Sequence, residues 1–355
     1  MVMPNLTRCE RDRSMKVDTM RRIDFYAGVP LCFFGSLFYK AVKWLSPRTK
    51  KDPKNVLFIE LSEMGSAILV DPAMRKLRDT TGAQLHFAIF KKNKPSLDLL
   101  QTVSPDNIYT IREDRLSSFL MDTFKFLHWT RKRKIDTVID LELFSRFTAL
   151  LTGFSGASNK AGFHAYFNEG LYRGDFLSHK VAYNPHMHIA KNFIALVNAL
   201  LSPKEEIPYS KTRIQDAEIS MAKVHITDTQ KKTVLDIIRG CFDAFDPSRH
   251  KIVLINPNAS EMLVQRRWPQ AYYGHLIKMI LGQCSHAVVL ITGDPRERDL
   301  MDRLDRAIPP HQGDLGASDS DPLVEAARRL AEYGPNELQS VHRTSPWTIL
   351  FAQFK

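Results

Sequence analysis

The chain has 355 residues, of which 44% are hydrophobic and 25% are charged, and its formal net charge is +11. These proportions are those of a folded chain of about two domains, and they exclude wholesale disorder. The four cysteines form no C-x-x-C pair and no disulfide framework, so a reducing compartment is the simpler interpretation. No uninterrupted apolar run reaches the ~18 residues of a spanning helix, which argues against a polytopic membrane protein.

The first 54 residues hold 12 Lys and Arg against five Asp and Glu, so most of the net charge lies there. The basic residues flank an apolar stretch, residues 27–45, which has Tyr39 and Trp44 near one end. This arrangement favours a helix lying in an anionic membrane surface, and a helix packed on the protein's own core is the alternative. We expect no cleaved signal peptide, because no small-residue cleavage site follows. We also expect no nucleic-acid binding, because the chain lacks a basic recognition helix with interleaved aromatic residues.

Short apolar runs alternate with helical periodicity through residues 55–214. Residues 55–61 predict a strand buried on both faces, residues 62–66 a glycine-containing turn, and residues 68–78 a helix, which is the opening of a βαβ unit. Later strands are predicted at residues 85–90, 107–111, 136–141 and, as a brief edge strand, 160–163, and later helices at residues 96–102, 115–134, 144–152 and 188–201. The alternation predicts one doubly wound α/β domain.

A second α/β pattern begins near residue 215 and is incomplete. Helices are predicted at residues 229–245, 269–281 and 296–308, a buried strand at residues 251–255 and a further strand at residues 287–292. Residues 309–321 then have the Pro/Gly/Asp/Ser composition of a linker. The expected parts are a basic and apolar segment with its linker (1–54), a first Rossmann-like domain (55–214), a partial second one (215–308) and a tail (309–355).

Three segments, in the same order and at the same spacing, resemble glycosyltransferase family 9, whose best-known members are the ADP-heptose:lipopolysaccharide heptosyltransferases. The segments are NVLFIELSEMGSA from residue 55, the run over residues 136–163, and VLINPNASEMLVQRRWPQ with VVLITGDPRERDL in the second domain. The resemblance extends from about residue 20 to residue 308. It implies an α/β fold of the GT-B type, in which one Rossmann-like domain holds the acceptor and the other, here incomplete, holds the nucleotide-sugar.

The resemblance also implies the chemistry. Family members invert the anomeric centre in one displacement, without a metal ion or another cofactor. The implied donor is an ADP- or UDP-linked sugar such as heptose, and the implied acceptor is a lipopolysaccharide-type or other lipid-linked glycan at the cytoplasmic face of the bacterial inner membrane. Such a transfer needs a base for the acceptor hydroxyl and fixed positive charge for the departing diphosphate.

The resemblance assigns the phosphate contacts to a turn and to an arginine pair. The turn matches the family's Pro-Gly-Ala-Ser turn, whose backbone N–H groups approach phosphate, and comprises Asn256, Asn258, Ala259 and Ser260 with the proline between them. Arg266 and Arg267 stand where the family has a Lys-Arg pair before Trp-Pro, and Arg266 matches the lysine that reaches the diphosphate. Arginine can do so with bidentate hydrogen bonds. A solvated basic turn before a helix is the alternative.

The catalytic base is where this chain departs from the family pattern. The family has an Asp directly after the glycine of the first turn, and here Ser66 follows Gly65. A serine hydroxyl is no useful base at neutral pH unless another group activates it, so Glu63 in the same turn is the predicted substitute. Asp140 and Glu142, at the end of a predicted strand, are further candidates, and a turn-capping role is the alternative for Asp140.

Contacts to the acceptor are predicted for Gly65 and His179. His179 is one of four histidines at positions 164, 179, 186 and 188, a group that raises the question of a metal site. His186 and His188 would lie on different faces of a helix, and no Cys or paired carboxylate accompanies them, so we expect no metal.

The C-terminal part departs from the family altogether. The family's Asp-Ser-Gly-Pro-x-His segment is absent, and residues 321–355, with the string AARRLAEYGPNEL, resemble the N-terminal region of P-type cation-transporting ATPases. The pump's phosphorylated Asp and membrane helices are missing, so this part implies no transport. A fused or truncated reading frame is the simplest account, and natural divergence is the rival. The second hypothesis for function is therefore a non-catalytic remnant that folds its first domain and still binds the anionic acceptor.

Overall fold

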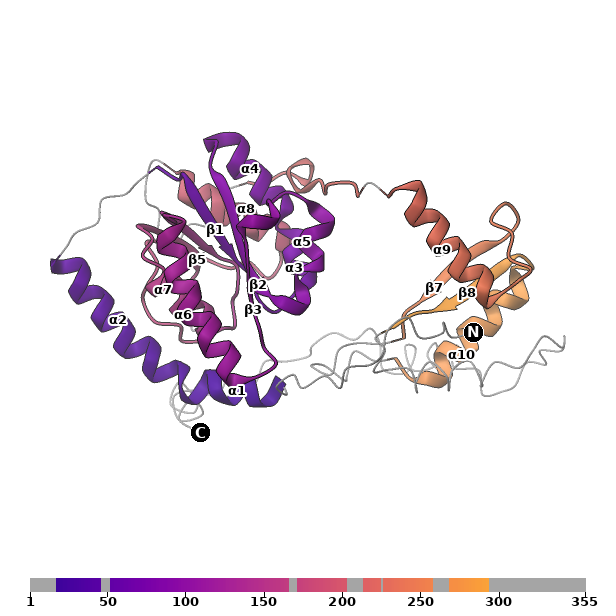
Figure 1. Ribbon diagram of the computed structural model, residues 1–355, viewed down its shortest axis with the longest axis horizontal. Helices are drawn as coiled ribbons and strands as arrows, with labels where there is room; N and C mark the ends of the chain where they lie inside the picture. Colours follow the sequence, from indigo (N-terminus) through magenta and orange to yellow (C-terminus); the bar gives the residue numbers. More distant parts are fainter. Residues whose placement is uncertain are drawn as a thin grey trace. The chain divides into compact units, whose positions relative to one another are not determined.

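The computed structural model describes residues 17–45, 52–165, 171–202, 213–224, 226–257 and 268–293. These residues belong to two compact units, of which one ends at Thr227 and the other begins at Asp228 (Figure 1). The helix predicted at residues 296–308 and the linker and tail predicted at residues 309–355 lie outside the described residues.

The first unit is built on a parallel sheet of six strands. They are β1 (Asn55–Ile59), β2 (Gln84–Phe90), β3 (Ile108–Ile111), β4 (Thr137–Asp140), β5 (Asn159–Phe163) and β6 (His179–Val181). Their spatial order is β3-β2-β1-β4-β5-β6, and every neighbouring pair is parallel. The chain therefore extends the sheet from β1 through β2 to β3, and then returns to the other side of β1 with β4. This is the doubly wound α/β arrangement predicted from the sequence.

Helices cover both faces of this sheet (Figure 1). One face carries α3 (Met64–Leu69), α4 (Asp71–Thr81), α5 (Pro95–Leu100) and α8 (Ile189–Leu201), and the other carries α6 (Leu116–Lys132) and α7 (Arg146–Phe154). In β1, Val56 and Phe58 pack into the core of the first face, and Leu57 and Ile59 into that of the second. Because successive strand residues point to opposite faces, a strand covered on both sides needs an unbroken apolar run.

Shorter 3₁₀ helices complete the first unit, and one predicted helix is divided. The 3₁₀ helices are η1 (Lys91–Asn93), η2 (Pro105–Asn107) and η3 (Asp216–Ile219). The helix predicted at residues 68–78 is two helices, α3 and α4, which meet at Val70. Pro72 stands in the first turn of α4, where its missing N–H is tolerated, but its ring prevents α3 from continuing. Helix α4 then ends at Gly82, whose φ of 69° is a left-handed conformation that glycine adopts readily.

The strand predicted at residues 160–163 as an edge strand instead lies inside the sheet. Strand β6 pairs with β5 from Ala161↔His179 to Phe163↔Val181 and forms the edge. With only three residues, β6 is too short for hydrophobic alternation to show, which is why the sequence pattern did not reveal it.

Two helices, α1 (Val17–Tyr26) and α2 (Gly28–Leu45), precede the sheet, and α2 packs against α7. Gly28 lies against Arg146, and Gly35 against Phe154 and Phe176, so closely that an added Cβ would meet these side chains at 2.9 and 3.2 Å. The inner face of α2 is therefore packed on the protein itself, as the alternative interpretation held. Its outer face is exposed.

The helical stretch Arg22–Leu45 is long and apolar enough to cross a membrane, judged by length and composition alone. The sequence pattern predicted no such run, because lysines and a proline interrupt the apolar residues. An N-terminal signal sequence or a packed helix of a soluble protein meets the same criterion, and only 22% of the apolar window is buried. The criterion therefore shows an apolar helix and does not by itself indicate a span.

In the second unit the structure describes two helices, α9 (Asp228–Cys241) and α10 (Gln270–Gln283), and two parallel strands, β7 (Lys251–Ile255) and β8 (Ala287–Ile291). These elements lie within a few residues of their predicted positions, and α10 has Pro269 as its N-cap residue. The prediction that β7 is buried is wrong, since Ile252 is 41% and Leu254 is 66% exposed.

Candidate active site

Acidic side chains gather where the strand order reverses. Strands β1 and β4 are neighbours in the sheet although β2 and β3 lie between them in the chain. In an open parallel sheet the loops that leave such a pair run to opposite sides, and ligands bind outside the carboxyl ends at this switch point. Glu60 and Glu63 follow β1 at this edge, and Glu142 follows Asp140, the last residue of β4.

Glu60 and Glu142 form a hydrogen-bonded carboxyl pair across the two strand ends. The Glu60 side chain is buried, and burial together with the nearby charge of Glu142 raises the pKa of Glu60 well above its usual value. Glu142 Oε1 accepts hydrogen bonds from the Leu61 N–H at 3.1 Å, the Ser62 N–H at 3.1 Å and the Ser62 hydroxyl at 2.8 Å. Two carboxyl groups are therefore held close together at the strand ends, and burial beside a like charge favours the protonated form of Glu60.

Glu63 and Ser66, both predicted as catalytic candidates, lie in contact. The Ser66 hydroxyl donates to Glu63 Oε2 at 2.7 Å, and the Glu63 N–H donates to Glu60 Oε1 at 3.2 Å. Glu63 is exposed and directly precedes α3, so its carboxylate is open to a ligand, unlike that of Glu60. The Ser66 hydroxyl therefore orients the Glu63 carboxylate. This carboxylate is also the neighbouring group that a serine at this position would need for its own activation.

Asp140, the buried last residue of β4, forms an ion pair with Arg173. Burial raises the pKa of Asp140 to about 6, even though the Arg173 guanidinium opposes the shift. Arg173 also donates to the Ser145 carbonyl at 2.8 Å and to the Thr148 hydroxyl at 3.0 Å. Both Asp140 oxygens are engaged, since Oδ1 accepts the Glu142 N–H at 3.2 Å, so Asp140 positions Arg173 and Glu142.

The two predicted acceptor contacts, Gly65 and His179, lie at opposite ends of the sheet. Gly65 is in the first turn of α3, and a Cβ added to it would meet nothing within 4 Å, so its backbone faces open space. His179 begins β6 and hence lies at the amino edge, where its Nδ1 is 2.9 Å from the Ser178 hydroxyl. The structure therefore places Gly65 in the carboxylate site and His179 outside it.

Of the predicted phosphate contacts, the structure describes only Asn256, which is exposed directly after β7. Asn258, Ala259, Ser260, Arg266 and Arg267 lie outside the described residues. Beyond them, Trp268 packs edge-on against Tyr273, with ring centres 5.0 Å apart, at the start of α10. In the described part of the chain no group of three or more His, Cys, Asp or Glu side chains is arranged to hold a metal ion.

Solved structures share this fold. The structure of the E. coli ADP-heptose lps heptosyltransferase II matches 72% of this chain and 69% of its own, with a TM-score of 0.54 and 16% identity. A glycosyl transferase family 9 structure from Veillonella parvula matches 73% of this chain and 67% of its own, with a TM-score of 0.54 and 16% identity. The E. coli heptosyltransferase WaaC with ADP-2-deoxy-2-fluoro heptose matches 70% of this chain and 72% of its own, with a TM-score of 0.50 and 15% identity.

The chain has the fold of the heptosyltransferases. The predicted α/β fold of the GT-B type is thereby confirmed. At 15–16% identity the likeness shows the fold and leaves the activity to be argued from the site. No curated protein matches the chain. Residues 320–355 match the family model described as "Cation transporter/ATPase, N-terminus", which confirms the second resemblance for a segment outside the described residues.

Two members of the site in this heptosyltransferase fold were not predicted. Glu60 carried a signal, because it is the one charged residue in the apolar run of residues 55–61, which was taken as strand throughout. Arg173 carried none, since it lies in a loop without periodicity and reaches Asp140 from 33 residues away.

Proposed function

We propose that this chain is a glycosyltransferase that transfers a sugar from a nucleoside-diphosphate sugar to a hydroxyl group of an acceptor bound beside Glu63. The observation that carries the proposal is the exposed Glu63 carboxylate, oriented by Ser66 at the switch point of the sheet. The fold shared with heptosyltransferases supports the same class of reaction.

Glu63 suits the role of base better than its neighbours do. Glu60 is buried and its pKa is raised by that burial, and Asp140 is buried in its ion pair with Arg173. Ser66 is held as a hydrogen-bond donor to Glu63. Among these four side chains, the Glu63 carboxylate alone is both exposed and oriented by a hydrogen bond from a neighbouring hydroxyl, as a general base that meets a substrate must be.

In the proposed reaction the acceptor hydroxyl loses its proton to Glu63 as its oxygen attacks the anomeric carbon. The bond between this carbon and the diphosphate breaks in the same step, on the opposite face, so the configuration inverts. The nucleoside diphosphate leaves with the electron pair, and the sequence resemblance assigns the neutralisation of its charge to the turn that begins at Asn256 and to Arg266 and Arg267. No metal ion takes part in this scheme.

The substrate classes are part of the proposal. One structural neighbour is described with ADP-2-deoxy-2-fluoro heptose and another with ADP, which supports an ADP-linked sugar as donor, with a UDP-linked sugar as the second choice. The acceptor is a lipopolysaccharide-type or other lipid-linked glycan, whose hydroxyl group would lie against the open backbone at Gly65.

The test measures release of ADP or UDP by the purified full chain, with sugar donor and glycan acceptor, for the wild type and Glu63→Gln. Removal of a general base lowers turnover by about 10²–10⁴-fold, and we expect the variant to bind nucleotide normally in calorimetry. Asp114→Asn, which removes an exposed carboxylate after β3, is the matched control and should keep the wild-type rate. Full activity of Glu63→Gln would overturn the assignment of the base.

The non-catalytic remnant is the second candidate, because Ser66 stands where family 9 has its proposed base. Calorimetric titration with ADP and UDP, beside an Arg266→Ala variant, separates the two. Binding that the variant loses supports a working donor site. Absence of binding, in a chain whose first unit is folded by circular dichroism, supports the remnant.

A further inference from the structure

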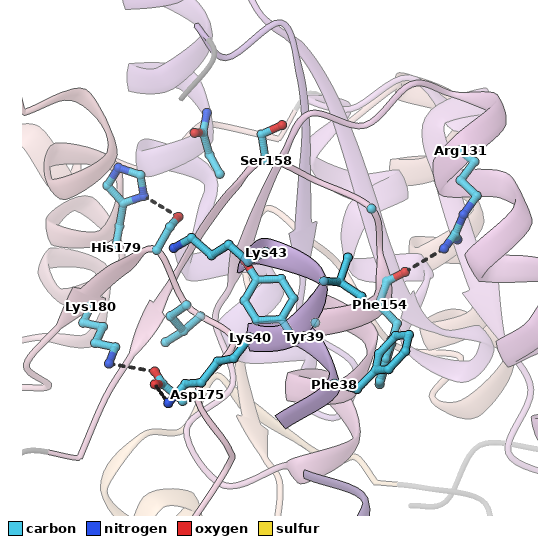
Figure 2. A pocket seen from close by; sticks show the side chains of 16 residues that line it. Phe38, Tyr39, Lys40, Lys43, Arg131, Phe154, Ser158, Asp175, His179 and Lys180 are labelled. Atoms are coloured by element: carbon cyan, nitrogen blue, oxygen red, sulfur yellow. Dashed lines mark hydrogen bonds and ion pairs between the residues drawn. The ribbon is translucent and has the colours of Figure 1, made fainter. Parts of the chain in front are cut away.

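A cavity of about 520 Å³ lies at the amino edge of the sheet, away from the carboxylate site. Its walls come from the second half of α2, the end of α7 and the starts of β5 and β6. Figure 2 shows the side chains of Tyr39, Lys40, Lys43, Arg131, His179 and Lys180 around it. Nothing in the proposed transfer reaction uses this cavity.

The lining is basic. It contains four cationic side chains, those of Lys40, Lys43, Arg131 and Lys180, and one carboxylate, that of Asp175. Lys40 and Lys180 bind the two oxygens of Asp175 at 2.7 and 2.8 Å. Burial disfavours the charged form of Asp175, but the two ammonium groups outweigh it and hold its pKa at about 2. The carboxylate thus fixes two lysines at the wall and leaves the lining with a net positive charge.

Lys43 makes no hydrogen bond or ion pair with any residue in the described part of the chain, and Figure 2 shows it among the lining side chains. A fifth cation lies behind the wall. The buried ammonium of Lys160 donates to the Gly153 carbonyl at 2.8 Å and lies 3.9 Å from the centre of the Tyr39 ring. A phosphate group in the cavity would therefore meet positive charge from several sides.

The outer face of α2 continues from this cavity as an apolar surface. Five of its side chains are each half or more exposed, namely Leu31 at 54%, Phe33 at 50%, Phe34 at 66%, Leu37 at 53% and Phe38 at 61%. Helical periodicity places Lys40 at the border between this face and the face packed on α7, and Lys43 one turn beyond Tyr39 on the packed side, toward the cavity. A helix of this kind, with a stripe of Phe and Leu and lysines beside it, fits the interface between headgroups and acyl chains.

We propose that the cavity beside α2 binds the phosphate of an anionic glycerophospholipid headgroup while the outer face of α2 lies in the same leaflet. The charge of the lining selects an anionic phosphate, and the adjoining apolar face selects a lipid over a phosphate dissolved in water. The proposal does not depend on the transferase activity. It concerns the opposite edge of the sheet from Glu63.

The first test is co-sedimentation of the full chain with vesicles of phosphatidylcholine, alone or with 30 mol% phosphatidylglycerol (about the anionic content needed for surface attraction). We expect binding to the mixed vesicles only, weaker at higher salt. Lys43→Glu should weaken it by about tenfold or more, because it replaces attraction by repulsion at the cavity. Lys223→Glu makes the same charge change at an exposed site elsewhere in the unit and should have a smaller effect. Equal effects of the two variants would overturn the headgroup site.

Two further variants separate the contribution of the cavity to vesicle binding from that of the apolar face of α2. Ser158→Phe fills the cavity without changing the charge, and circular dichroism checks that it folds. It should reduce the preference for phosphatidylglycerol, whereas Phe34→Ser should weaken binding to the mixed vesicles by removing apolar contact. Thermal stabilisation by inorganic phosphate without vesicle binding, or a dimer that buries α2 in sedimentation, would each contradict the proposal.

Discussion

Asp24 of α1 and Arg146 at the start of α7 join two helices that are far apart in the sequence. Asp24 Oδ2 lies 3.0 Å from Arg146 Nη1, and Oδ1 accepts the backbone N–H groups of Arg146 at 2.9 Å and Phe147 at 3.1 Å. One carboxylate thus pairs with a buried guanidinium and caps the amino terminus of α7. The segment before the sheet is therefore part of the first unit.

The first prediction follows from this pair. Asp24→Ala leaves Arg146 buried without its partner and removes a helix cap, so we expect the free energy of unfolding to fall by about 2–4 kcal/mol. Urea denaturation of the full chain measures it. Arg22→Ala removes an exposed side chain from the same helix and should change stability by less than about 0.5 kcal/mol. Similar losses for both variants would show that Asp24 has no special role.

The second prediction concerns the pH dependence of stability. The folded state raises the pKa of Glu60 above its ordinary value of 4.5, so the folded chain keeps a proton that the unfolded chain releases. The contribution of Glu60 is complete below pH 4.5 and is lost as the pH rises through the higher folded pKa. Glu60→Gln keeps an uncharged hydrogen-bond donor beside Glu142. Between pH 5 and pH 8 the free energy of unfolding of this variant should therefore fall less than that of the wild type. Parallel urea midpoints over this range for variant and wild type would exclude the raised pKa of Glu60.

The third prediction concerns the position of the catalytic carboxylate in the turn after β1. Ser66→Asp restores the carboxylate that family 9 has after the glycine, but it places a second charge within reach of Glu63, since the serine hydroxyl now lies 2.7 Å from Oε2. We expect Ser66→Asp combined with Glu63→Gln to recover activity that Glu63→Gln alone loses. Initial rates of nucleotide release measure it. A double variant no faster than Glu63→Gln would argue that the two positions do not share one role.

The fourth prediction separates stability from binding at Gly65. A Cβ there meets no atom within 4 Å, and alanine suits a helix better than glycine does, so Gly65→Ala should stabilise the chain by about 0.5–1 kcal/mol. If the acceptor lies against this backbone, the same methyl group should raise KM for the acceptor while that for the donor stays unchanged. Gly240→Ala, at a helical glycine with the same open surroundings in α9, is the control for stability alone. An unchanged acceptor KM would place the acceptor elsewhere.

Much of the fold was readable from local patterns. Strand β1 was predicted because Val56, Leu57, Phe58 and Ile59 are all apolar, and a strand covered by helices on both faces requires that run. Strand β6, with three residues and no alternation, was missed, so β5 was taken for the edge. Leu254 of β7 was predicted as buried and is exposed, because an apolar run shows strand propensity without showing what covers it.

In the candidate site, too, some features follow from the sequence and others from the tertiary structure. The sequence by itself determined that Glu63, Gly65 and Ser66 share one turn, because neighbours in a short turn are neighbours in space, and it determined the apolar, basic character of residues 27–45. Only the tertiary structure decided that Glu60 meets Glu142, that Arg173 neutralises Asp140 and that His179 lies at the other end of the sheet. These relationships depend on which strands become neighbours, and the pairing of β1 with β4 across some 80 residues is a property of the whole sheet.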